Sequence, residues 1–402
     1  LGEYEPLVNM RAGIANVLDY GAVGDGVADD TAPILAAVAT GRQTIRFPPV
    51  GANGATYKVT SSLTPLTNQT WIGSPGFQQT TTANPARVRI FGAFDGPVIA
   101  ATSVPSVTIS GLHIFGASDS ALRNNVGINT TNCDRWIIRN NVIFGFGGQG
   151  ISISGGVALR LEHNYTYNCV MGTTGHTDWV GAVELYCSDP YVAFNEFSSV
   201  PGGHVYDTGY IAALVAGSNN GFFIANMLEL SEAGIAVTGG YNTFIGNRCD
   251  LNKGHGWVVV GGANRFVGNW SHRNGQGTTN TYDGFSVQST AQGNLFSSNQ
   301  VTRNIGNQMR YGFASAAAFV HSAQNTFIGN TVQYQAALTG EYNLTPTEGA
   351  AQFYGAKLIA PGGIGVGNSA AATTLGTVTK KIEVFDAAGA SLGFVPVYGS
   401  IT

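Results

Sequence analysis

An asparagine that directly follows a short apolar strand recurs along the chain, and this repeat limits the possible folds more than any other feature. It closes segments such as Thr243 to Asn247 (TFIGN) and Arg265 to Asn269 (RFVGN). The series is Asn164, Asn195, Asn226, Asn247, Asn269, Asn299 and Asn330, with spacings of 31, 31, 21, 22, 30 and 31 residues. A coil of 21 or 22 residues with insertions of about nine predicts an all-β, right-handed parallel β-helix with three short strands per coil and about ten coils. The asparagines should stack inside one tight turn as an amide ladder.

A glycine that opens the next strand gives a second marker of the same repeat. It occurs at Gly150, Gly181, Gly209, Gly234, Gly256, Gly284 and Gly312. From Asn164 onward, 17, 14, 8, 9, 15 and 13 residues separate the asparagine from this glycine, so long loops gather on one side of the coils. Insertions that share one side of a solenoid usually build its binding surface.

The two ends of the chain depart from the repeat and predict three regions. Residues 1–45 contain a short strand, a glycine turn and a helix that places Ile34, Leu35 and Val38 on one face, which can cap the open end of a solenoid. Residues 46–340 form the β-helix. Residues 341–402 form a small C-terminal β region, in which the segment from Lys381 to Tyr398 reads as a β-hairpin that could cap the last coil or pair with another subunit.

Composition narrows the possible partners. Only 10% of the residues are charged, the formal net charge is −4, and no basic stripe is present that could follow a phosphate backbone, so we expect no nucleic-acid partner. No stretch of about 18 apolar residues occurs, so we expect no membrane partner. The four cysteines have no CxxC spacing, which disfavours a zinc site, although two disulfides stay possible. Cys249 should point into the core.

The run from Asp19 to Thr31 (DYGAVGDGVADDT) resembles the N-terminal signature of the pectate-lyase-like β-helix superfamily, which includes polygalacturonase-related enzymes and phage tailspike depolymerases. The resemblance continues through the coils over about residues 14 to 340. It implies the β-helix fold, places the aspartates of the run in the cap, and carries no catalytic motif. Related tailspikes are trimeric, so the resemblance also implies a homotrimer.

Acidic and aromatic residues just before the strand-opening glycines form our first candidate site. The catalytic candidates are Asp207, Glu232, Glu184, Asp178 and Asp283, and the substrate-binding candidates are Trp179, Tyr206, Tyr282, His204, His255 and Arg310. Coils stack about 4.8 Å apart, so these side chains should line one groove. Aromatic rings stack on the apolar faces of sugars, and paired carboxylates cleave glycosidic bonds. For any single aspartate the capping of a loop or turn is the stronger interpretation, whereas the group as a whole favours a ligand groove.

A second-choice cluster lies on the strand that follows the asparagine ladder. Glu229, Asp250 and His272 each stand three residues after a ladder asparagine on consecutive coils. Glu196, Arg248 and Trp270 stand one residue after it. Two carboxylates about 5 Å apart resist simultaneous ionisation, which raises the pKa of one as a general acid requires. The alternative is a solvated ladder of mixed charge.

The sequence therefore predicts a carbohydrate-active enzyme that cleaves a polysaccharide or oligosaccharide, most simply a glycoside hydrolase without cofactor or metal. A polysaccharide lyase is the second hypothesis, because Arg310, Lys253 and the histidines could serve elimination and the aspartates could hold Ca²⁺. A non-catalytic tailspike or adhesin that binds glycans is the third. We expect an extracellular or virion-associated homotrimer; Val258 and Val260, registered outward, and the apolar hairpin could form its interface.

Overall fold

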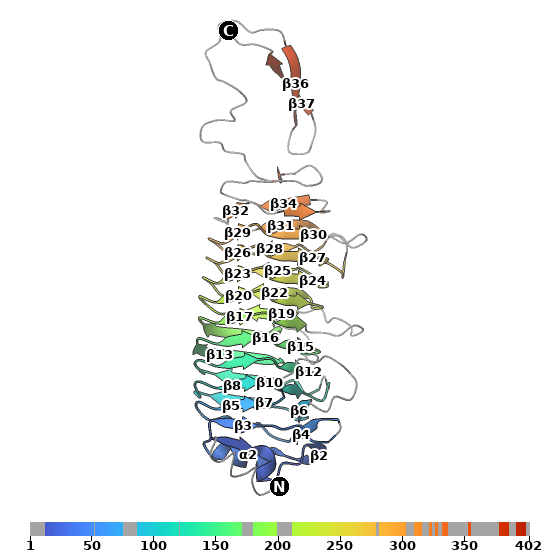
Figure 1. The fold of residues 1–402 in the computed structure, drawn as a ribbon. Coiled ribbons are helices and arrows are strands. Elements are labelled where there is room, and N and C mark those ends of the chain that lie inside the picture. The colour runs from blue at the N-terminus through green and yellow to red at the C-terminus, as the bar shows by residue number, and fades with distance from the viewer. Residues whose placement is uncertain are drawn as a thin grey trace.

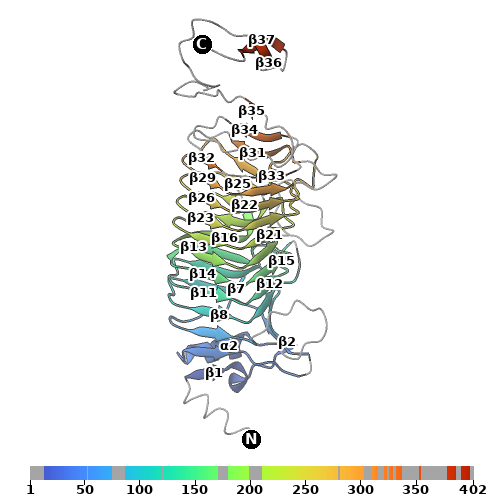
Figure 2. The same cartoon turned by 45° about the horizontal axis from the view of Figure 1, so that its top comes forward.

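The chain winds into a right-handed parallel β-helix, which Figure 1 shows as a stack of coils. The computed structural model describes residues 13–51, 53–74, 87–119, 121–170, 180–198, 211–278, 281–302 and 309–315, and the backbone of further strands between 321 and 398. Three parallel sheets of 12, 12 and 11 strands run along the stack, so the coils slightly outnumber the ten expected. Figure 2 shows the same stack from a second direction.

From β5 to β34 each coil contributes one strand to each sheet, whereas the first two coils contribute strands only to sheets A and B. Sheet A contains β1 (Ile14–Asn16), β3 (Thr44–Arg46), β5 (Thr70–Ile72), β8 (Thr108–Ser110), β11 (Ile137–Arg139), β14 (Arg160–Glu162), β17 (Tyr191–Ala193), β20 (Phe222–Ile224), β23 (Thr243–Ile245), β26 (Arg265–Val267), β29 (Leu295–Ser297) and β32 (His321–Ala323). Sheet B contains β2 (Asp25–Asp29), β4 (Ala55–Val59), β6 (Val88–Gly92), β9 (His113–Phe115), β12 (Val142–Phe144), β15 (Tyr165–Tyr167), β18 (Glu196–Ser198), β21 (Met227–Glu229), β24 (Arg248–Asp250), β27 (Trp270–His272), β30 (Gln300–Thr302) and β33 (Thr326–Ile328). Sheet C contains β7 (Pro97–Thr102), β10 (Val126–Thr131), β13 (Ile151–Val157), β16 (Val180–Ser188), β19 (Ile211–Ala216), β22 (Ala233–Val237), β25 (Trp257–Val259), β28 (Phe285–Val287), β31 (Tyr311–Ser315), β34 (Val332–Ala336) and β35 (Phe353–Tyr354).

The asparagine ladder lies in the turn between sheets A and B, as the repeat predicts. Asn226 donates to the side-chain oxygen of Asn247 from its backbone nitrogen at 3.0 Å and from Nδ2 at 2.9 Å. The ladder begins one coil earlier than expected, at Asn141, and runs through Asn299, while Asn330 lies outside the described residues. Each amide bridges two coils and so fixes their register.

Two further asparagine ladders occupy the other two turns, and the sequence reading missed them. Asn242, Asn264 and Asn294 connect the turn between sheets C and A, because each accepts a backbone N–H from the coil before it. Asn252 and Asn274 do the same between sheets B and C. Buried amides satisfy the turn backbone groups that parallel strands leave unpaired.

The core consists of inward side chains that stack on their own kind from coil to coil. Phe244 stacks on Phe223 at 4.6 Å and on Phe266 at 5.0 Å, and Phe266 stacks on Phe296 at 4.4 Å between ring centroids. Cys249 lies in this core as predicted, and all four cysteines are buried and free. Burial raises the pKa of both the Cys169 and the Cys187 thiol to about 12.

The helix α2 (Thr31–Ala39) lies at the N-terminal end of the stack, preceded by the 3-10 helix η1 (Val17–Tyr20) (Figure 1). Asp30 is its N-cap residue, but its carboxylate accepts the backbone N–H groups of Val23 and Gly24 at 2.6 and 3.1 Å. This aspartate therefore holds the glycine turn, which fits the structural role that the family resemblance implies. Ile34 and Val38 are buried and Leu35 is half-buried against the core.

The C-terminal segment contains the expected hairpin, since β36 (Val378–Phe385) pairs antiparallel with β37 (Ser391–Tyr398). At the other end, β1 and β2 already belong to sheets A and B. The division at residues 45 and 340 stays a prediction. Among the helices of the described part, none is long and apolar enough to cross a membrane.

Candidate functional site

The outer face of sheet B carries two columns of side chains, one on each side of the inward residue of every strand. The first column runs through Tyr165, Glu196, Met227, Arg248 and Trp270, which are paired in register on consecutive coils. The second column contains Tyr167, Ser198, Glu229, Asp250 and His272. The register of the second-choice cluster is thus confirmed.

The N-terminal half of the second column is aromatic. Phe91, Phe115, Phe144 and Tyr167 stack at centroid distances of 4.7, 5.3 and 4.7 Å. Tyr165 lies 4.9 Å from Tyr167 and so widens the aromatic surface to both columns. All five rings are partly exposed. They form a platform that ends directly at the coil of Glu196, because Tyr165 pairs with Glu196 in register.

The C-terminal half of both columns, from Glu196 to His272, is mainly charged or polar, and we call it the charged half. Asp250 lies at its centre. It is fully buried, and Arg273 binds it with two hydrogen bonds, Nε to Oδ1 at 3.0 Å and Nη2 to Oδ2 at 2.7 Å. Arg248 also donates to Oδ2. Asp250 is therefore a buried carboxylate held between two arginines.

Glu229 and Glu196 are the partly exposed carboxylates beside it. Burial raises the pKa of Glu229, and the nearby charges of Glu196 and Asp250 raise it further. Burial also raises the pKa of Glu196. Glu229 pairs in register with Asp250, whereas Glu196 lies one strand away and two residues out of register, which places the Cα atoms of the two glutamates about 8 Å apart.

Trp270 and His272 close the charged half. The Arg248 guanidinium lies 4.6 Å over the Trp270 ring, and the Trp270 and His272 rings are 4.5 Å apart. Thr302 accepts the Trp270 Nε1–H at 2.8 Å and hydrogen-bonds His272. Burial lowers the pKa of His272, so its neutral form is favoured. The aromatic and charged residues thus follow one another along the same two columns of sheet B.

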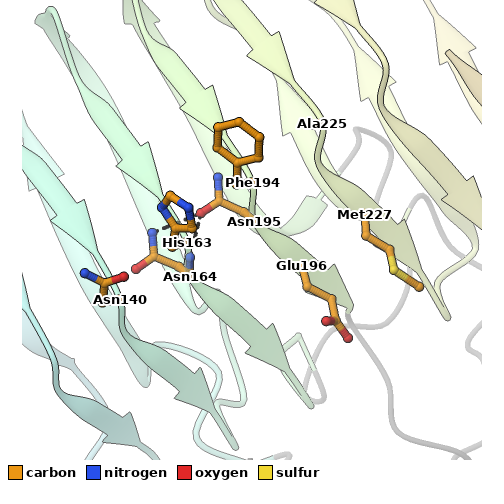
Figure 3. A pocket seen from close by; sticks show the side chains of 8 residues that line it. All are labelled: Asn140, His163, Asn164, Phe194, Asn195, Glu196, Ala225 and Met227. Atoms are coloured by element: carbon orange, nitrogen blue, oxygen red, sulfur yellow. Dashed lines mark hydrogen bonds between the residues drawn. The ribbon is translucent and has the colours of Figure 1, made fainter. Parts of the chain in front are cut away.

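A groove of about 440 Å³ adjoins this face at the turn between sheets A and B. Figure 3 shows its lining, with Phe194 and His163 on the outside of the turn and Glu196 and Met227 on the adjacent strands of sheet B. Asn140, Asn164, Asn195 and Ala225 complete the lining. Phe194 is 53% exposed, and its ring stacks on His163 at 5.2 Å.

The structure describes part of the first candidate site. Glu184 on β16 is buried, and its Oε1 accepts Gln149 Nε2 and the backbone N–H of Gly181, each at 3.0 Å. Glu232 is ion-paired with Lys253 at 2.6 Å. Asp178, Trp179, His204, Tyr206 and Asp207 lie outside the described residues, so the groove as a whole stays a prediction.

Asp283, Tyr282, His255 and Arg310 do come together on this side of the coils. Asp283 is fully buried and accepts two hydrogen bonds from Arg310, at 3.1 and 2.8 Å. Its backbone N–H donates to His255 Nδ1 at 2.9 Å, and the rings of His255 and Tyr282 meet edge to face at 5.3 Å. Burial lowers the pKa of His255, which favours the neutral imidazole. The ion pair with Arg310 gives Asp283 a structural role in this arrangement.

Two further expectations concern metal ions and the interface. Within the described ranges, no group of three or more His, Cys, Asp or Glu residues could hold a metal ion. Val258 does face outward from sheet C, but it is 3% exposed and packs in a second apolar cluster with Val215, Ala236 and their neighbours. It therefore presents no free surface, and the homotrimer stays a prediction.

The aromatic half of sheet B is what the sequence reading missed, although the same register contains it. Phe144 and Tyr167 stand three residues after Asn141 and Asn164, as Glu229 does after Asn226. Extending the ladder one coil toward the N-terminus would have shown that the acidic column continues as an aromatic column.

No protein-family profile and no curated protein sequence matches the chain. Solved structures do. A tailspike protein of E. coli bacteriophage HK620, in complex with a pentasaccharide, matches with a TM-score of 0.62 at 11% identity over 86% of this chain and 65% of that one. The A-module of the Azotobacter vinelandii mannuronan C-5 epimerase AlgE4 matches with a TM-score of 0.54 at 14% identity over 84% of this chain and 99% of that one.

PfbA, a surface adhesin of Streptococcus pneumoniae, matches with a TM-score of 0.50 at 14% identity, over 96% of this chain and all of that one. At these identities the likeness concerns the fold. The chain belongs to the parallel β-helix proteins, as its coil repeat and its N-terminal signature indicate.

Proposed function

We propose that this protein binds a polysaccharide along the outer face of sheet B and hydrolyses its glycosidic bonds there. One observation carries the proposal: two partly exposed carboxylates with raised pKa, Glu196 and Glu229, stand where an aromatic platform meets the buried carboxylate of Asp250. Two of the similar structures support a carbohydrate role. The tailspike is described in complex with a pentasaccharide, and the epimerase module is named for its action on mannuronan.

The two glutamates divide the chemistry. Burial and the charges of Glu196 and Asp250 raise the pKa of Glu229 against the opposing charges of Arg248 and Arg273, which makes Glu229 the candidate to donate a proton to the leaving glycosidic oxygen. Glu196 then acts as the base that removes a proton from the attacking water. The two glutamates lie on neighbouring strands of sheet B, and we propose the inverting mechanism, in which a water stands between the two carboxyl groups.

Asp250 acts on this pair without touching the substrate. Buried between Arg248 and Arg273, it fixes a charge one strand from Glu229 and thereby favours the protonated form of that acid. It is a positioning residue. Phe144 stacks face to face with Phe115 and Tyr167, so the platform presents apolar ring edges to the sugars on one side of the cleavage point.

The test compares glutamine variants on a panel of polysaccharides, with reducing ends and absorbance near 235 nm followed together. Glu229→Gln and Glu196→Gln should each lower the rate about 100-fold or more. Glu162→Gln, a carboxylate on the outer face of sheet A, is the matched control and should keep the wild-type rate. Rates within threefold of wild type for both sheet B variants would show that this is not the catalytic site.

The first candidate site is tested in the same assay. Asp207→Asn, Glu232→Gln and Glu184→Gln should leave the rate near that of the wild-type protein if sheet B is the site. A large loss in these variants, with Glu229→Gln unaffected, would move the chemistry to the loops before sheet C.

A polysaccharide lyase is the second candidate, favoured by the cluster of His255, Tyr282 and Arg310. Elimination would require His255 to give up the hydrogen bond that its Nδ1 accepts from the Asp283 N–H, since that is the basic nitrogen of the neutral ring, and Arg310 to bind the uronate carboxylate beside Asp283. New reducing ends with new absorbance near 235 nm would establish elimination. New ends without absorbance would establish hydrolysis. The absence of both signals would indicate a glycan-binding protein without catalytic activity. For each case we propose an extracellular or virion-associated homotrimer.

A further inference from the structure

The turn between sheets A and B uses the same backbone conformation on the coils that carry the asparagine ladder. The residue just before each ladder asparagine has a positive φ: 56° at Asn140, 53° at His163, 57° at Phe194 and 51° at Ala225. Gly246 and Gly268, at 63°, occupy the same position on later coils. This left-handed region favours glycine, and a bulky residue such as phenylalanine is strained there.

Nothing in the fold requires a large side chain at this position. A Cβ built on Gly246 or Gly268 would meet no atom within 4 Å, so the position points into open space. Phe194 is 53% exposed, and its ring is stacked on the equally outward ring of His163. A strained backbone that carries an exposed aromatic pair is a feature that stability alone would not favour.

The pair forms one wall of the groove that also contains Glu196 and Met227 (Figure 3). The groove volume of about 440 Å³ falls within the range typical of small-ligand sites. Its eight lining residues combine ring faces, amides and one carboxylate, and they include no lysine or arginine. A ring face with neighbouring amides suits a sugar, and a carboxylate without a cation disfavours a uronate.

We propose that this groove is a binding subsite for an uncharged sugar residue, in which the His163–Phe194 pair is the stacking platform. The inference rests on the proposed function, because it places the subsite next to Glu196, at the edge of the cleavage site. A saccharide chain on sheet B that continues over the turn would reach it. The subsite makes the protein selective for a neutral sugar at that position.

The test measures binding of maltohexaose, xylohexaose, chitohexaose and hexamannuronate by calorimetry. The wild-type protein should bind a neutral hexasaccharide more tightly than hexamannuronate. Phe194→Gly should bind it about 5- to 10-fold more weakly, which is the loss expected for one stacking ring. Phe194→Tyr should keep the affinity.

Folding provides the control, because glycine suits this backbone. The thermal midpoint of Phe194→Gly should stay within about 2 °C of the wild-type value. Ser298→Gly changes the same position, at a φ of 55°, on a coil outside the groove, and should alter neither the midpoint nor the affinity.

Three results would overturn the inference: unchanged affinity in Phe194→Gly, preference for hexamannuronate, or no binding of any of the four probes by the wild-type protein. Cleavage that depends on Glu229 while Phe194→Gly binds normally would refute the subsite and keep the proposed hydrolase. Binding that depends on Phe194 without any cleavage would support the subsite and refute the hydrolase.

Discussion

Replacement of Asn247 by leucine tests the principle that holds the coils together. Asn247 is buried, and its amide makes four hydrogen bonds: Nδ2 donates to Phe223 O and Asn269 Oδ1, and Oδ1 accepts the backbone N–H and the Nδ2 of Asn226. Asn226 Nδ2 keeps a second acceptor, Val192 O at 2.9 Å.

The magnitude follows from the groups that lose their partners. In Asn247→Leu, the Asn226 N–H loses the bond that the amide oxygen supplied, within a buried turn, whereas the Phe223 carbonyl keeps its place in the pairing of β20 with β23. A buried polar group left unpaired costs about 1 to 3 kcal/mol, so this one group predicts a loss of about 1 to 3 kcal/mol in the free energy of unfolding. Neighbouring ladder positions should behave alike, since they make equivalent bonds.

Urea unfolding followed by circular dichroism measures this loss through the midpoint and the slope. Thr243→Ala, on the strand just before Asn247 and only half-buried, is the control and should change the free energy by less than about 0.5 kcal/mol. A change in Asn247→Leu no larger than in this control would refute the view that the amide ladder stabilises the coils.

Three further predictions concern other parts of the molecule. Burial, with the charges of Arg87 and Arg89, lowers the pKa of His113 to about 4 from 6.5; the unfolded chain therefore binds a proton more readily, and stability should fall by roughly 2 to 4 kcal/mol as the pH drops from about 6.5 to about 4. Urea midpoints across this range would check the loss, and His113→Asn should abolish that dependence. Asp283→Asn should lower the free energy of unfolding by about 3 kcal/mol, because Arg310 loses its buried carboxylate partner. A wild-type urea midpoint with reduced cleavage would instead assign Asp283 to catalysis. Light scattering should give three times the 41.8 kDa mass of one chain, and the mass of a single chain across micromolar concentrations would exclude the trimer.

The fold could be read from the sequence because a solenoid repeats its local rules. Each coil must place an amide in the same turn and an apolar residue at the same inward position, so spacing alone revealed Asn164 through Asn299 and the inward Cys249. The capping helix and the terminal hairpin could be predicted for the same reason: local composition and turn chemistry determine them.

The same register placed Glu229, Asp250 and His272 in one column, but it could not say what surrounds them. Arg273, which binds Asp250 with two hydrogen bonds, stands in the next turn and carries no repeat signal. The acidic and aromatic residues in the loops before sheet C predicted a catalytic groove. In the structure, Glu232 and Asp283 are paired with cations that only the folded chain brings close.

The sequence by itself determined the coil, its strands and the order of side chains along each face, because these depend on periodicity and on pairing between successive coils. The tertiary structure alone decided the electrostatic character of each group. Burial and nearby carboxylates raise the pKa of Glu229, and Arg273 binds Asp250. Both effects depend on residues that come from different coils and turns. The groove beside Glu196 also exists only in three dimensions, since the rings of His163 and Phe194 meet across two coils that are 31 residues apart in the sequence.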